Sequence, residues 1–167
     1  MNTFRILFIA TLMAVLPSIL FAGDFTLGAD ISWSTEMESN GDKLYNYRGE
    51  ERVPFALMSE MGLNAVRLRV WVNPAKHNIW CGKEDVLAKA KRAQALGMDI
   101  MIDFHYSDWW ADPAKQNIPE EWKKHKYKQM LTDVADHTKE VLSFLKENSI
   151  NVKWVQVGNE TSNGMLW

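Results

Sequence analysis

Residues 65–105 read AVRLRVWVNPAKHNIWCGKEDVLAKAKRAQALGMDIMIDFH, and this stretch decides the predicted fold. Its two ends, Ala65–Trp71 and Met98–His105, are short apolar runs that are typical of buried strands. Between them Glu84–Leu96 is rich in Ala and is followed by Gly97, which indicates a helix and its end. A strand, a helix and a second strand in this order predict a parallel pair joined by a right-handed crossover.

The same alternation of strand and helix continues on both sides of this unit. The apolar period and the terminating residues predict two more strands, Phe25–Ser32 and Val152–Val157. They also predict a helix over Glu50–Met61, with Val53, Leu57 and Met61 on one face and Gly62 after its end. A second, longer helix is predicted over Pro119–Glu147, with one apolar face made of Tyr127, Leu131, Val134, Val141 and Leu145. The predicted order is βαβαβαβ, which makes the chain an α/β protein with a parallel sheet.

Two architectures fit this order, an open doubly wound sheet and a (β/α)8 TIM barrel. An open sheet usually carries a Gly-rich phosphate-binding turn after its first strand. The first turn here, ADISWSTEMESNG at residues 29–41, has no such motif. A whole barrel needs about 200 residues or more. The 167 residues supply four strands and three helices, so we expect roughly the first half of a barrel.

Polar residues fall at the carboxyl end of every predicted strand. Because alternate side chains of a barrel strand face the helices and the interior, the apolar positions assign these residues to the interior: Asp30, Arg67, Arg69, Asp103, His105 and Glu160. That end of a barrel holds the active site. Each residue also has a structural interpretation: a loop cap for Asp30, structural ion pairs for Asp103 and at least one arginine, a core position for His105, and a helix N-cap for Glu160.

The first residues, MNTFRILFIATLMAVLPSILFA, predict a signal peptide over residues 1–22. Arg5 supplies a positive start, Ile6–Leu16 an apolar centre, and Ala22 a small residue for cleavage. The apolar run is too short for a convincing membrane span. Residues 23–167 then form the exported part, the amino-terminal half of one barrel domain, with a single cysteine, Cys81, so no internal disulfide is possible.

Composition and motifs exclude several classes of function. The formal net charge is -2 and no basic run is present, which argues against nucleic acid as a partner. The sequence has no nucleotide-binding Walker loop, no GxSxG elbow, and no HExxH or Cys/His spacing for a metal. What remains is carboxylate chemistry beside aromatic side chains, since the chain carries eight tryptophans.

Three segments closely resemble the family 53 glycoside hydrolases: RLRVWVNP (67–74), DFHYSDWWADP (103–113) and VQVGNETSNGMLW (155–167). These enzymes are secreted, retaining arabinogalactan endo-β-1,4-galactanases built on a (β/α)8 barrel. The resemblance covers about residues 28–167, and the second segment is the most specific. It implies a galactan or arabinogalactan polysaccharide from pectin side chains as partner, and a monomer at full length. We expect no cofactor and no metal in this half of the barrel, while a structural calcium in the other half stays open.

The resemblance also implies roles for individual residues. Glu160 matches the general acid/base, and Asn159 matches the residue that hydrogen-bonds the sugar hydroxyl beside the reacting carbon. Arg67 matches the arginine that supports the nucleophile. His105 matches an active-site histidine, Trp110 a sugar-stacking aromatic residue, and Asp30 an acidic residue of less defined role. Trp71 and Trp109 are two further candidates for the cleft.

The resemblance places the nucleophile at the end of the seventh strand, and no residue of this chain matches it. Glu36, Glu38 and Asp108 lie in predicted loops without matching it. We therefore expect the 167-residue chain to be inactive alone. Two alternatives stay open: a β-mannanase or cellulase of the same clan, and a non-catalytic carbohydrate-binding protein.

Overall fold

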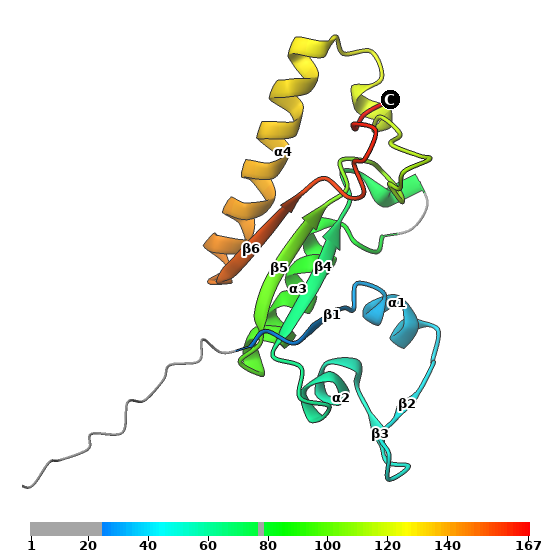
Figure 1. The fold of residues 1–167 in the computed structure, drawn as a ribbon, viewed down its shortest axis with the longest axis vertical. Helices are drawn as coiled ribbons and strands as arrows, with labels where there is room; N and C mark the ends of the chain where they lie inside the picture. Colours follow the sequence, from blue (N-terminus) through cyan, green and yellow to red (C-terminus); the bar gives the residue numbers. More distant parts are fainter. Residues whose placement is uncertain (1–24, 77–78) are drawn as a thin grey trace, which may run out of the picture.

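The computed structural model describes residues 25–76 and 79–167, so the predicted signal peptide lies outside the described residues. Four parallel strands form one sheet in the order β1-β4-β5-β6, and the arrows of β4, β5 and β6 point toward the upper right of Figure 1. They span β1 Gly28–Asp30, β4 Ala65–Val70, β5 Asp99–Phe104 and β6 Val152–Val157. The predicted strands are confirmed, and β1 is shorter than predicted.

Three helices cover one face of the parallel sheet, as predicted, and each lies in the connection from one strand of this sheet to the next. They are α2 (Pro54–Glu60), α3 (Lys83–Ala95) and α4 (Tyr127–Glu147). Buried apolar side chains from this face and from the helices form a single core that includes Phe55, Leu68, Ala90, Ile102 and Val141. Burial of these side chains holds the crossovers against the sheet.

The first predicted helix is wrong at its start. Residues 50–53 are extended, because β3 (Glu51–Arg52) pairs antiparallel with β2 (Leu44–Tyr45), and α2 begins only at Pro54. Proline at the first helical position has a fixed φ and lacks an N–H, which suits a helix start. Val53 is consequently exposed rather than part of a buried helical face.

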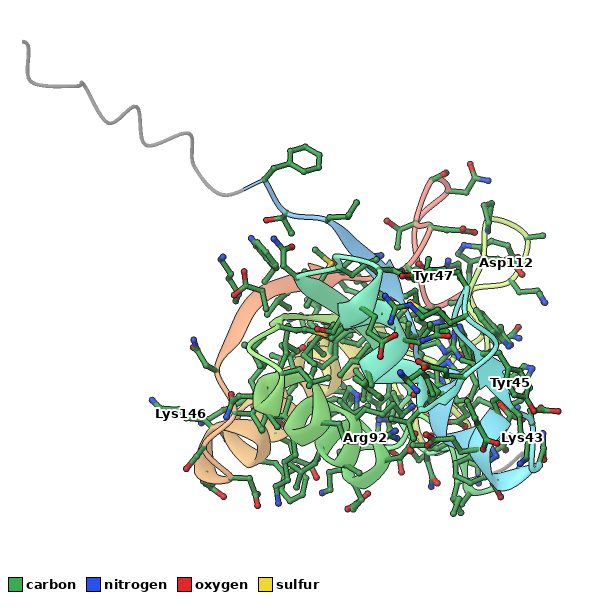
Figure 2. The ribbon with its side chains drawn as sticks, turned by 90° about the horizontal axis from the view of Figure 1, so that it is seen from below. Lys43, Tyr45, Tyr47, Arg92, Asp112 and Lys146 are labelled. Atoms are coloured by element: carbon green, nitrogen blue, oxygen red, sulfur yellow. The ribbon has the colours of Figure 1, made fainter. Side chains whose placement is uncertain are left out.

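The loop after β1 and the long helix also differ from prediction. The first loop contains the short helix α1 (Ser34–Ser39), and Figure 2 shows Lys43 and Tyr45, which follow it, on the opposite side of the molecule from Lys146. The helix predicted from residue 119 is instead a 3₁₀ turn, η2 (Glu120–Trp122), followed by α4. A second 3₁₀ turn, η1, spans Pro74–Lys76.

The register of the sheet separates two faces. Val66, Ile100 and Val152 align on the helix-covered face, whereas Arg67 aligns with Asp30 and Arg69 with Asp103 on the other face. Strand β6 lies at the edge of the sheet, so two of its helix-side valines, Val155 and Val157, stay exposed. Among the described residues, no helix is long and apolar enough to cross a membrane.

Candidate active site

The Arg67 guanidinium lies at the centre of the polar end of the sheet. It donates to Oδ2 of Asp30 at 2.8 Å, Oδ2 of Asp103 at 2.5 Å, Oδ1 of Asn159 at 2.7 Å and Oε1 of Gln156 at 3.1 Å. These partners come from β1, β5, β6 and the turn after β6. One side chain of β4 therefore ties together the carboxyl ends of all four parallel strands, where alternation predicted that polar groups would meet.

Asp103 and His105 form the buried side of this network. The backbone N–H of Ala111 donates to His105 Nδ1 at 3.0 Å, and His105 Nε2 lies 3.1 Å from Oδ2 of Asp103. Because Nδ1 accepts a hydrogen bond, the imidazole is neutral and carries its proton on Nε2, which donates to Asp103. Both side chains are almost fully buried. His105 thus links Asp103 to the loop that carries Trp110.

A tight turn after β6 presents Asn159 and Glu160. Gly158 has φ +84°, and a Cβ there would lie 2.6 Å from a methyl carbon of Thr161, so only glycine fits. The buried Asn159 amide accepts from Arg67 and donates to the Ala111 carbonyl at 2.7 Å. Glu160 follows with φ 50°, an uncommon backbone conformation for a non-glycine residue.

Glu160 differs from the other carboxylates at this end of the sheet. It is exposed, and its side chain makes no hydrogen bond or ion pair with the described part of the chain. Asp30 and Asp103, in contrast, are both held by Arg67. Of these three carboxyl groups, Glu160 is therefore the one that remains available to a ligand.

An aromatic wall stands beside the network. The ring centroids of Trp71 and Trp109 are 4.5 Å apart, and those of Trp71 and Trp110 are 6.0 Å apart. Trp110 is 43% exposed, whereas Trp71 is buried. Trp110 can therefore stack on a ligand, and Trp71, a cleft candidate from the sequence, instead supports its neighbours from below.

A second polar cluster lies behind the wall and joins the loop after β1 to helix α3. The fully buried Lys89 ammonium pairs with Asp85 at 2.6 Å and donates to the Ser32 carbonyl at 2.5 Å. Asp85 also accepts from the Cys81 backbone N–H at 2.6 Å and from the Thr35 hydroxyl at 2.7 Å. Cys81 is buried, which raises the pKa of its thiol and supports a structural role.

The segment after β5 is fixed to α4 by its aromatic residues. The Tyr106 hydroxyl lies 2.8 Å from the Thr138 hydroxyl, and burial raises the pKa of Tyr106. His137 packs edge-on against Phe104 and Trp122, and its Nε2 is buried without a hydrogen bond to any residue that the structure describes. Burial lowers the pKa of His137 to about 4. These contacts place the 105–111 loop firmly above the sheet.

The structure brings five of the predicted site residues into one network and its margin. Asp30, Arg67, His105 and Asn159 are joined by hydrogen bonds, and Glu160 follows Asn159 directly. Sequence reasoning missed two glutamines. Gln156 lies in register with Asp103 and could have been found by alternation along β6, whereas Gln116, which donates to the Asn159 carbonyl at 2.8 Å, gave no signal. Within residues 25–76 and 79–167 no cluster of metal-ligating side chains is found.

Comparison with known proteins shows the family of this chain. The family described as "Glycosyl hydrolase family 53" matches residues 26–167. An "Endo-beta-1,4-galactanase" from Bacillus subtilis is 37% identical over 84% of this chain and 34% of its own length. An "Arabinogalactan endo-beta-1,4-galactanase" from Cellvibrio japonicus is 40% identical over 83% of this chain and 36% of its own length.

Solved structures agree with the sequence comparison. The catalytic domain of a family 53 protein from Ignisphaera aggregans superposes with a TM-score of 0.80 at 37% identity, over 86% of this chain and 42% of that one. A fungal β-1,4-galactanase superposes with a TM-score of 0.78 at 35% identity, over 84% of this chain and 41% of that one. The described strands and helices are thus the first half of a TIM barrel, and the chain spans well under half the length of these relatives. The chain belongs to glycosyl hydrolase family 53.

Proposed function

We propose that the protein is a secreted endo-β-1,4-galactanase that cleaves galactan or arabinogalactan side chains of pectin with retention of configuration. The observation that carries this proposal is the position of the exposed Glu160, directly after Asn159, at the ends of four parallel strands. Arg67 fixes this position through its hydrogen bond to Asn159. The names of the relatives from Bacillus subtilis and Cellvibrio japonicus support the substrate class.

Glu160 is proposed as the general acid that protonates the glycosidic oxygen and then as the base that activates water. A retaining mechanism needs a second carboxyl group about 5–5.5 Å away as nucleophile. Asp30 and Asp103 pair with Arg67 at the ends of β1 and β5, whereas the family resemblance places the nucleophile at the end of the seventh strand, so neither is assigned that role. We assign the nucleophile to a residue outside this chain, so the 167 residues alone should bind galactan without cleaving it.

Two further residues are proposed to contact the sugar. The exposed part of the Trp110 indole can stack on the apolar face of a galactose ring. Asn159 uses Oδ1 and one amide hydrogen within the protein, which leaves its second amide hydrogen for a sugar hydroxyl. Arg67 and His105 hold these groups in place rather than touching the sugar.

Binding tests the substrate class on the chain itself. We expect β-1,4-galactotetraose to bind more tightly than mannotetraose or cellotetraose in isothermal titration calorimetry, and Trp110→Ala to abolish binding. Preference for mannotetraose or cellotetraose would instead support a mannanase or a cellulase of the same clan.

Hydrolysis tests the catalytic role of Glu160. Reducing ends released from β-1,4-galactan should be absent with the 167-residue chain and present with the gene product extended through its complete barrel. Glu160→Gln in the extended protein should remove activity, whereas the matched control Glu121→Gln, at an exposed position, should leave it unchanged. A fully active Glu160→Gln variant would end the assignment and favour another acid or a binding role.

We also infer export, because residues 1–22 have the charge and apolar pattern of a signal peptide. Amino-terminal sequencing of the secreted protein should give Gly23 as its first residue. Retention of the uncleaved chain in the cytoplasm would contradict this inference.

A further inference from the structure

Arg69 is a buried cation that the proposed chemistry does not use. It lies two residues after Arg67 on the same face of β4, in register with Asp103. The two arginines differ sharply: Arg67 pairs with Asp30 and Asp103, whereas Arg69, only 5% exposed, forms no ion pair with a described residue. Its Nε is buried without a hydrogen-bond partner among the described residues.

Aromatic rings surround the Arg69 guanidinium instead. Its central carbon lies 3.9 Å from the ring centroid of Trp110 and 5.0 Å from that of Trp71. The backbone N–H of Arg69 donates to the Ser32 hydroxyl at 2.7 Å, which fixes the start of the side chain. The guanidinium therefore occupies one face of the Trp110 indole.

This arrangement does not favour stability. Burying a charge without an opposite charge costs more free energy than a cation–π contact returns. A neutral side chain of similar length, such as Met, would pack in the same space without that cost. The charge of Arg69 therefore has another effect than stabilisation, and the partly exposed Trp110, whose ring it covers, is the residue on which it can act.

We propose that Arg69 is a positioning residue that fixes the Trp110 indole for stacking on a sugar. The guanidinium covers one ring face and His105 meets the ring at an angle of 65° and a centroid distance of 5.9 Å, while Trp110 as a whole stays 43% exposed and so keeps surface for a sugar. Without the cation the indole would be free to rotate into the space above β4, and each binding event would have to order it again. This inference rests on the proposed function, because it names what orients the sugar-stacking residue of that site.

The test compares Arg69→Met, which keeps length without charge, with Arg69→Lys, which keeps the charge. Arg92→Met is the matched control, because Arg92, on helix α3 (Figure 2), also lies over an aromatic ring, that of Phe55 at 4.5 Å. Unlike Arg69, it is paired with a carboxylate, that of Glu38. Three quantities are measured on the 167-residue chain: the Kd for β-1,4-galactotetraose, the indole N–H resonance of Trp110 assigned with Trp110→Phe, and the melting temperature.

We expect Arg69→Met to weaken galactotetraose binding roughly tenfold, to broaden or shift the Trp110 resonance, and to leave the melting temperature unchanged or higher. Arg69→Lys should recover part of the affinity, and Arg92→Met should change neither affinity nor resonance. In the Trp110→Phe background the effect of Arg69→Met on Kd should shrink, because the two residues act as a unit.

Two results would overturn the inference: an unchanged Trp110 resonance in Arg69→Met, or a melting temperature that falls while Kd stays constant, which would mark Arg69 as structural. Failure of the proposed function is separable from both. If the unsubstituted chain does not bind galactotetraose, the substrate assignment fails, while the resonance and melting measurements still decide whether Arg69 holds Trp110.

Discussion

Replacing Arg67 by Met should show how strongly the network depends on one guanidinium. The substitution removes all four side-chain hydrogen bonds to Asp30, Asp103, Gln156 and Asn159 while keeping an unbranched apolar stem. It leaves two carboxylates without their cation. The size of the effect depends on how readily each carboxylate can return to water.

The two carboxylates differ in this respect. The side chain of Asp30 is 27% exposed, so it can rehydrate and contributes at most about 1 kcal/mol. The side chain of Asp103 is 0% exposed, its Oδ1 has no partner among the described residues, and after the substitution only His105 would remain beside Oδ2. A stranded buried charge costs about 3–5 kcal/mol, so the buried carboxylate dominates the total.

We therefore expect the free energy of unfolding to fall by about 4 kcal/mol. Urea titration followed by far-ultraviolet circular dichroism should show the midpoint falling by roughly 2 M at unchanged slope, and the melting temperature should fall by about 8–16 °C. Arg52→Met is the control, since Arg52 also contacts two carboxylates, Glu50 and Glu60, but at the exposed β2–β3 hairpin. Its midpoint should scarcely move.

A double variant checks the electrostatic cause in the same urea titration. Adding Asp103→Asn to Arg67→Met should restore part of the lost stability, because it removes the stranded charge. The network is not an electrostatic unit if Arg67→Met costs no more than Arg52→Met, or if Asp103→Asn makes the double variant less stable still. Either outcome would refute a dominant contribution from the buried Asp103 carboxylate.

Three further predictions follow from buried or strained positions. The pKa of His137 is lowered from 6.5 to about 4 on folding, so between these pH values the unfolded chain binds a proton that the folded chain does not. The contribution of His137 to the free energy of unfolding should be complete above pH 6.5 and should decline by at most about 3 kcal/mol as pH falls to 4. Urea titrations at several pH values should show this decline, and His137→Phe should remove it. Gly158→Ala combines φ +84° with a 2.6 Å approach to Thr161 and should cost about 2 kcal/mol or more, measured by thermal unfolding. Lys89→Met strands the Asp85 carboxylate and should cost about 3–5 kcal/mol in the same measurement.

Each of these has a matched control within the chain. His125 lies at an exposed position, so His125→Phe should leave the acid-side slope of His137 in place. Gly49 has φ +75° with open space around its Cα, so Gly49→Ala should cost only the backbone term, about 1 kcal/mol. Lys83 pairs with Glu140 near the surface, so Lys83→Met should be milder than Lys89→Met. Equal effects within any pair would contradict the stated cause.

The sequence predicted the strands well because their signal is short and periodic. The limits of β6 agree with the prediction to the residue, and alternation correctly placed Arg67 and Asp103 on one face. Helix starts were less predictable. The apolar residues at 53, 57 and 61 repeat at helical spacing, yet the pairing of β2 with β3 takes Val53 out of the helix, and pairing between segments is invisible to a local pattern.

Parts of the site were beyond sequence reasoning for a similar reason. The resemblance named Arg67, His105, Asn159 and Glu160, but hydrogen-bond partners depend on distances between strands. Alternation along β4 did not distinguish Arg69 from Arg67, since both face inward; the structure shows that Arg67 contacts two carboxylates and Arg69 contacts aromatic rings. Burial of Trp71 was likewise hidden until its neighbours were placed.

The left-handed backbone of Glu160 has a consequence for the natural history of the gene. At φ 50° a residue without a side-chain preference for that region is held at a cost of about 1–3 kcal/mol, which Gly or Asn would largely relieve. A lineage in which hydrolysis no longer mattered would therefore gain stability by drifting to Gly or Asn at position 160. Sequencing natural alleles at this codon would show whether selection still maintains the carboxylate, because without such selection the more stable Gly or Asn variants would replace it.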